Sequence, residues 1–197
     1  RSLMTREKEP QIASEQNAGG VQIMSIHRSK GLEFPVVILC DLNHRFNGAD
    51  QTSPVLVHPR LGLGTERVDT ARRVRYPTIS KIALAQEMEK EMLSEEMRLL
   101  YVAMTRAKEK LILVDCLKNA RSHVQKLSAL TELPVPPQVV RSAKTMGDWV
   151  LQVLLCSTEA GAIHAWAGIA PPVRESNAGW RVYLHETPAT PAAARVQ

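Results

Sequence analysis

The sequence is poor in aromatic residues and in cysteine, and it contains no long hydrophobic run. Only 4% of its 197 residues are aromatic, so its core has to be built from aliphatic and methionine side chains. The three cysteines, Cys40, Cys116 and Cys156, stand far apart and lack the spacing of zinc ligands. An odd and scattered set of this kind indicates a reducing compartment, with Cys40 and Cys116 expected in the core.

No apolar run approaches the roughly 18 residues that a membrane span requires. The N-terminus also lacks the charged-then-apolar pattern of a signal peptide. Together these absences predict a cytoplasmic protein. Because the chain begins with Arg1 rather than Met, we expect it to be part of something longer.

Several chemical motifs are missing as well. The sequence contains no GxxxxGK[ST] loop to cradle phosphates and no Asp-Glu pair after a strand to hold Mg²⁺. It shows neither a nuclease-type set of carboxylates and lysine nor the cysteines of an iron–sulfur cluster. These absences exclude a self-contained nucleotide site. The 25 basic residues exceed the 20 acidic ones, giving a net charge of +5. This balance suits either a polyanionic partner or an ordinary, mildly basic domain.

The pattern of apolar residues predicts strands that alternate with helices. We expect strands at 21–26, 36–40, 55–57, 111–114 and 180–184, the second of them buried on both faces. Helices are expected at 80–93 (capped by Ser80), 95–107, 119–130, 145–156 and 158–168. The second helix would bury a stripe of Met97, Leu100, Tyr101 and Met104. Residues 43–79 read as largely irregular with a Gly-rich turn at 61–64, and 131–143 as a Pro-rich connector. The alternation indicates an α/β layered domain.

A polar turn follows the first predicted strand. It reads Ser25-Ile26-His27-Arg28-Ser29-Lys30-Gly31-Leu32-Glu33-Phe34. If the strand forms, the turn lies at its carboxyl end, where ligands of α/β sheets gather. Its cations, hydroxyls and backbone N–H groups suit phosphate, whereas the Glu33 carboxylate suits a ribose hydroxyl. A solvated turn with Gly31 at positive φ explains the same residues equally well.

A second phrase, Leu99-Leu100-Tyr101-Val102-Ala103-Met104-Thr105-Arg106-Ala107-Lys108, leads from a helix into a strand. Arg106 is well placed there to reach a phosphate with its guanidinium. It could equally be a basic residue that complements the helix dipole. Arg98 could face the same side or pair with Glu95 within the helix. Lys108 is expected to be a solvated helix end.

Together the two phrases resemble motifs V and VI of the UvrD-like superfamily 1 DNA helicases. Over residues 20–185, the chain is most similar to the AddA group of helicase–nuclease subunits, notably in PVLVHPRLGLGTERVDTARRVRYPT and in the helix from Met146. The resemblance implies a RecA-like second motor domain, with a mostly parallel sheet flanked by helices, over residues 21–130. Residues 1–20 would be a linker from a preceding inserted domain. Residues 131–197 would lead toward a further C-terminal region.

The resemblance also implies roles for individual residues. Arg106 matches the arginine finger, the catalytic group that touches ATP held with Mg²⁺ mainly by a first motor domain. Gly31 and Glu33 match nucleotide-contacting positions, with Thr105 supporting Arg106. Three residues match the DNA track, although Lys30 could serve either ligand: Ser25, His27 and Lys30.

The activity implied is that of an ATP-dependent 3′–5′ DNA helicase of bacterial double-strand-break repair and recombination. Its partners would be single- and double-stranded DNA, the N-terminal motor domain of the same chain and a second, AddB-like nuclease subunit. These residues alone are expected to be inactive. Two alternatives stay open: a UvrD- or PcrA-type repair helicase without a nuclease, and a non-catalytic RecA-like DNA-binding module. The basic cluster of Arg72, Arg73 and Arg75 is either an additional DNA contact or a solvated loop.

Overall fold

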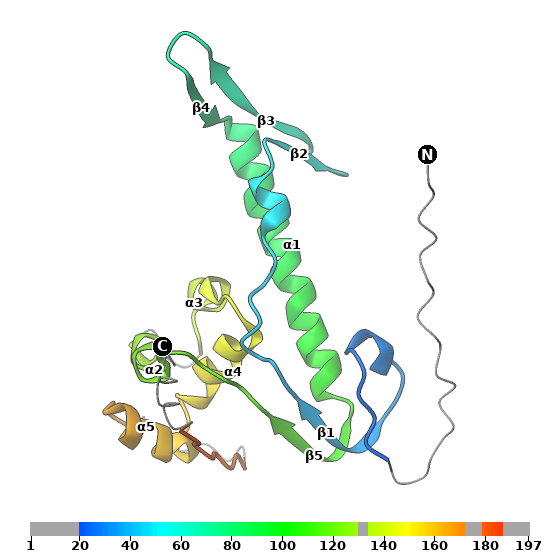
Figure 1. Cartoon of the computed structure of the whole chain (residues 1–197), viewed down its shortest axis with the longest axis vertical. Helices are drawn as coiled ribbons and strands as arrows, with labels where there is room; N and C mark the ends of the chain where they lie inside the picture. The colour runs from blue at the N-terminus through cyan, green and yellow to red at the C-terminus, as the bar shows by residue number, and fades with distance from the viewer. Residues whose placement is uncertain (1–19, 130–133, 172–178, 187–197) are drawn as a thin grey trace, which may run out of the picture.

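A computed structural model describes residues 20–129, 134–171 and 179–186 of the chain. One long helix, α1 (Ile79–Met104), connects two different parts of the molecule (Figure 1). A three-stranded antiparallel sheet lies along its N-terminal half, and a two-stranded parallel sheet with short helices lies at its C-terminal end. The predicted linker at 1–20 falls, except for Gly20, outside the described residues.

The parallel sheet pairs β1 (Phe34–Leu39) with β5 (Ala107–Leu113). Phe34 lies opposite Ala107 and Leu39 opposite Leu113, with an irregularity after Phe34. Leu39 packs with residues of α1 and α4 in a buried cluster. The predicted α/β architecture, a parallel sheet flanked by helices, is therefore confirmed.

Two predictions about strands near this sheet are wrong. Residues 21–26 form no strand, and Val21 and Ile23 are 92% and 97% exposed. A strand needs a neighbour to receive its backbone hydrogen bonds, and none lies beside this segment in the described part of the chain. Nor is β1 buried on both faces, because Val36 and Ile38 are about half exposed.

The region expected to be largely irregular forms an antiparallel sheet of β2 (Val55–His58), β3 (Gly62–Asp69) and β4 (Val74–Pro77), after a short 3-10 helix at Ala49–Thr52. Much of the predicted glycine turn at 61–64 belongs to β3. Gly64 is there for space rather than for turning, since a Cβ at this position would lie 2.7 Å from the Lys81 Cα. Leu56 is buried in the same contact.

The region expected to hold two helices is the single helix α1. The Oγ1 of Thr78, not Ser80, caps it by accepting a hydrogen bond from the Lys81 N–H at 3.3 Å. Ser94 does not interrupt it, because its hydroxyl donates to the carbonyl of Lys90 at 2.8 Å within the helix. The expected buried stripe is also wrong in part: Leu100 is buried, whereas Tyr101 is 67% exposed.

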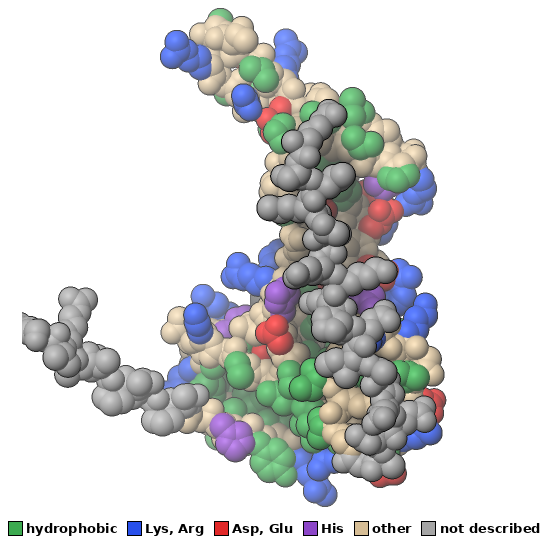
Figure 2. Space-filling model, turned by 45° about the vertical axis from the view of Figure 1, so that its right-hand side comes forward, with side chains coloured by type: hydrophobic (Ala, Val, Ile, Leu, Met, Phe, Trp, Pro, Cys, Tyr) green, Lys and Arg blue, Asp and Glu red, His purple; other side chains and the backbone are tan. Residues whose placement is uncertain are grey.

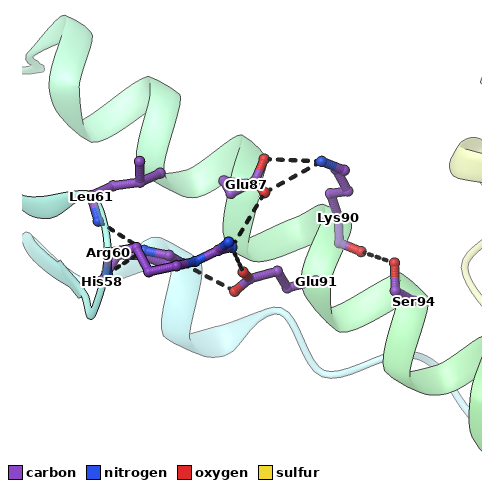
Figure 3. Close-up of polar contacts among 7 residues, drawn as sticks. All are labelled: His58, Arg60, Leu61, Glu87, Lys90, Glu91 and Ser94. Atoms are coloured by element: carbon purple, nitrogen blue, oxygen red, sulfur yellow. Dashed lines mark hydrogen bonds and ion pairs between the residues drawn. The ribbon is translucent and has the colours of Figure 1, made fainter.

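A cluster of polar contacts fastens the turn between β2 and β3 to α1 (Figure 3). Buried His58 accepts the backbone N–H groups of Arg60 and Leu61 at Nδ1, so its Nε2 carries the proton that Glu91 accepts at 3.0 Å. The guanidinium of Arg60 donates to the other oxygen of Glu91 at 2.5 Å. The hydrogen bond from His58, and then that from Arg60, lowers the pKa of Glu91.

Short helices complete the lower part of the molecule. They are α2 (Ala120–Ser128), α3 (Pro137–Ser142), α4 (Met146–Leu154) and α5 (Gly161–Ala167), the last preceded by a 3-10 helix at Thr158–Ala160. The predicted helices near 119–130, 145–156 and 158–168 are thus confirmed within a few residues.

Three other predictions for this part are wrong. The connector contains α3, whose first residue is a proline, the position that tolerates it. Residues 180–184 form no strand. Cys40 and Cys116 are exposed, whereas Cys156 is buried, because the first two follow the ends of β1 and β5 instead of lying under a helix. Among the described helices, none is long and apolar enough to cross a membrane.

Candidate functional site

The polar turn before β1 is held by its own backbone. A 3-10 turn at His27–Ser29 is closed by hydrogen bonds from the backbone N–H groups of Arg28 and Ser29 to the carbonyl of Ser25, at 3.1 and 3.3 Å. The buried Ser29 hydroxyl donates to the carbonyl of Ile26 at 2.7 Å. Gly31 then turns the chain toward β1 at φ +84°, as the sequence predicts.

Three side chains that the sequence assigned to DNA lie exposed on this turn: Ser25, His27 and Lys30. None of them has a side-chain hydrogen bond or ion pair within the described residues. They are therefore available to a ligand from solvent.

The register of the parallel sheet brings Arg106 to the same turn. Because Phe34 and Ala107 are paired, the residues just before each strand become neighbours, and the Phe34 N–H donates to the Arg106 carbonyl at 2.9 Å. The site thus lies at the amino ends of β1 and β5. The expectation of a site at the carboxyl end of a strand over 21–26 is wrong, since that strand does not form.

The guanidinium of Arg106 is fixed by three hydrogen bonds. Nη1 donates to the Leu32 carbonyl at 3.0 Å, Nε to the Val102 carbonyl at 3.0 Å and Nη2 to the Thr105 hydroxyl at 3.1 Å. Since a guanidinium has five N–H donors, two remain for an external acceptor. The side chain is half-buried, so its charge is oriented before any ligand arrives.

Thr105 occupies the place the sequence suggested for it, beside Arg106. Its hydroxyl donates to the Val102 carbonyl at 3.0 Å while accepting from Arg106. The carbonyls of Leu32 and Val102, by contrast, leave no signal in a sequence, because every residue has one.

Glu33 forms an ion pair that the sequence did not predict. Its Oε2 lies 3.2 Å from the Nζ of Lys108, and both side chains are 58% exposed. Lys108 was expected to be a solvated end, but the strand register places it beside Glu33. An exposed pair of this kind contributes less than about 1 kcal/mol, so either group can exchange its partner for a ligand.

Arg98 is not part of this cluster. It pairs with Glu95 one turn earlier on α1 and remains largely exposed. Of the alternatives weighed for this residue, the structure shows the intrahelical pair.

The residues present fit a contact with a phosphate rather than a complete nucleotide site. They offer two free guanidinium N–H groups and one exposed carboxylate beside them. The described part of the chain has no group of three or more His, Cys, Asp or Glu side chains able to hold a metal ion. A nucleotide touching Arg106 would therefore need most of its binding from another domain.

This arrangement, an α/β unit with one prepositioned arginine, is that of a motor subdomain. The chain belongs to the UvrD-like helicase C-terminal domain family, whose match spans residues 2–118.

Its relatives are bacterial proteins named as subunits of an ATP-dependent helicase/nuclease, of the type called AddA. The chain is 46% identical to the one from Heliobacterium modesticaldum over 156 residues, which are 77% of this chain and 11% of that protein. It is 42% identical to the Thermoanaerobacter pseudethanolicus protein over 171 residues, 86% of this chain and 14% of that protein. For Desulforudis audaxviator the identity is 40% over 184 residues, 89% of this chain and 15% of the relative. The chain thus spans about a seventh or less of these relatives.

Proposed function

We propose that these residues serve as the second motor domain of an ATP-dependent DNA helicase within a helicase–nuclease subunit. In this proposal Arg106 is the arginine finger. Gly31 and Glu33 contact the nucleotide from the adjoining turn, and three neighbouring residues line the path of single-stranded DNA: Ser25, His27 and Lys30. ATP with Mg²⁺, held mainly by a first motor domain, supplies the phosphoryl group whose transfer to water drives the motor.

The hydrogen bond between Arg106 and the Leu32 carbonyl carries this proposal. It joins the second motif to the first at a distance of 3.0 Å, although 74 residues separate them in sequence. Arg106 would place its two free N–H groups against the terminal phosphate, where its charge offsets the charge developing during transfer. Glu33 would accept a hydrogen bond from a ribose hydroxyl after leaving Lys108.

The same turn offers a route for coupling. His27 and Glu33 lie on one short, hydrogen-bonded segment, so a change at the nucleotide would displace the residues proposed to grip DNA. Within this division of labour, His27 acts on DNA and Arg106 on ATP. The names of the relatives further support a partner that is a second nuclease subunit, and we include 3′–5′ polarity in the proposal.

Substitution of Arg106 in the complete protein tests the proposal. We expect Arg106→Ala to lower the kcat of DNA-stimulated ATP hydrolysis by roughly 10³–10⁵-fold, the contribution of such an arginine in other NTPases. Arg106→Lys should restore little, because an ammonium cannot reproduce the three fixed hydrogen bonds of the fork.

Arg98→Ala is the matched control, since it removes an arginine from the same helix–strand unit but not from the site. It should leave kcat near the wild-type value. His27→Ala should weaken the stimulation by DNA more than the KM for ATP. If Arg106→Ala keeps full ATPase activity, or weakens DNA binding as much as His27→Ala does, the proposed roles are wrong.

A further inference from the structure

Four arginines gather at the free end of the antiparallel sheet. We call them the basic tip: Arg67, Arg72, Arg73 and Arg75. They lie on β3, on β4 and in the turn that joins them, and all four are exposed. Figure 2 shows basic side chains around this end of the molecule, which projects beyond the start of α1.

The charge of the basic tip is almost unneutralised. Within the described residues, only Arg72 has a carboxylate nearby, with its Nε 4.0 Å from Asp69. Arg67, Arg73 and Arg75 have no ion pair or side-chain hydrogen bond there. Arg60, at the opposite end of the same sheet, is by contrast bound to Glu91. A protruding group of unpaired arginines attracts a polyanion, and guanidinium groups suit phosphate oxygens in particular.

Arg73 has an unusual backbone conformation. Its φ is +53°, in the left-handed region that favours glycine and costs other residues about 1 kcal/mol or more. Replacing it by glycine would therefore remove a charge and relieve the backbone at once. This gives a variant in which loss of binding cannot be attributed to loss of folding.

The basic tip is far from the proposed nucleotide contact. Helix α1 has 26 residues, or about 39 Å at 1.5 Å per residue, and it separates the tip from Arg106. At 3.4 Å per base pair, this length corresponds to roughly 11 base pairs of DNA. Because one uninterrupted helix connects the two, both would move together.

We propose that the basic tip is a second DNA-binding site that holds the phosphodiester backbone away from the motor track. The inference rests on the proposed function insofar as the complete protein acts on DNA. It assigns to the antiparallel sheet a role that the motif turn and Arg106 do not have. Tyr76, exposed and paired with Arg67 across the strands, can stack on a base if the bound DNA is single-stranded.

The test compares DNA affinity of the complete protein, without nucleotide, for a short single strand, a long single strand and a long partial duplex. The variant carries Arg72→Gln, Arg73→Gly and Arg75→Gln. We expect its affinity for a long DNA to fall roughly tenfold, and the slope of log affinity against log salt to fall by about 2–3, one unit for each lost phosphate contact. Which long probe responds identifies the strand form that is bound.

Arg60→Gln is the control, because it removes an arginine of the same sheet that is already neutralised. It should leave affinity and salt dependence unchanged, and the single variant Arg73→Gly should lose affinity while its melting temperature holds or rises. Unchanged affinity and slope on both long probes would overturn the proposal, as would a defect confined to binding an acidic protein partner. ATPase activity on the short strand should not change. A failure of the arginine-finger proposal would therefore be seen separately, in the Arg106 variants.

Discussion

Asp115 is a carboxylate in an unfavourable place. Its Oδ1 accepts the N–H of Cys116 at 2.9 Å, but its Oδ2 is buried with no hydrogen-bond partner in the described structure. Burial raises the pKa of Asp115, with the nearby negative charge of Asp148 adding to the effect. A charged group in this position disfavours the folded state unless water or another group compensates it.

The sign of the pH dependence follows from this raised pKa. In the unfolded chain the carboxyl group loses its proton near pH 3.8, its ordinary value, and in the folded chain only at higher pH. The unfolded state therefore releases its proton first. This carboxyl lowers the free energy of unfolding as pH rises from 3.8 through the folded pKa, and the loss persists at neutral pH.

We predict that Asp115→Asn stabilises the protein at neutral pH by about 1 kcal/mol, or a melting temperature higher by about 2–4 °C. The gain should diminish in acid, where the wild-type carboxyl is also neutral. Thermal unfolding across acidic to neutral pH measures this, with the exposed Asp50→Asn as control. A lower melting temperature for Asp115→Asn at neutral pH would show that the charge is compensated.

At the scale of elements, α1 is the axis of the molecule. Its first half carries the antiparallel sheet through Gly64, Leu84 and the polar cluster around His58, and its second half packs Leu93 and Leu100 against Trp149 and the parallel sheet. A helix of this length has little intrinsic stability and depends on the packing of its buried side. The two sheets therefore stabilise different halves of one helix.

Gly64→Ala is predicted to loosen the antiparallel sheet. The new methyl group would lie 2.7 Å from both the Cα of Lys81 and the Cδ1 of Leu84, so β3 has to move away from the helix. We expect a loss of about 1–3 kcal/mol, the usual cost of overpacking, and faster hydrogen exchange in β2–β4 than in β1 and β5.

Gly161→Ala serves as the comparison for this variant, since nothing lies within 4 Å of a Cβ at that position and its φ is negative. It should be neutral or slightly stabilising. Equal exchange rates in both sheets of Gly64→Ala would mean that the molecule unfolds as one unit.

At the scale of the whole molecule, the described chain has two buried clusters in its lower part and an unfilled parallel sheet. One cluster centres on Trp149, and the other joins α2, α4 and α5 through Val124, Leu154 and Ile163. The parallel sheet has only two strands, and the apolar residues Val36 and Ile38 of β1 are partly exposed. Parallel strands are ordinarily covered on both faces, so this side suits a neighbouring part of a larger protein.

We predict that residues 1–197 alone neither hydrolyse ATP nor unwind DNA. The sequence lacks a phosphate-binding loop, and Arg106 can only complete a nucleotide site formed elsewhere. The measurement is DNA-stimulated phosphate release by the purified chain, compared with that of the complete protein. Activity that disappears in the Arg106→Ala form of the same chain would contradict this prediction.

The sequence by itself determined what local chemistry can determine. The two motifs identified the family, the positive φ of Gly31 followed from its place in a polar turn, and the periodic segments near α2, α4 and α5 were located within a few residues. These features depend on neighbouring residues, whose preferences the sequence displays directly.

Only the tertiary structure decided where distant residues meet. The pairing of Phe34 with Ala107 places Arg106 on the Leu32 carbonyl, and it selects Lys108 as the partner of Glu33. The loss of the strand at 21–26 and the antiparallel order of β2–β4 were equally hidden. Strand register and bonds to backbone carbonyls depend on segments far apart in the chain, and every residue offers the same backbone groups to them.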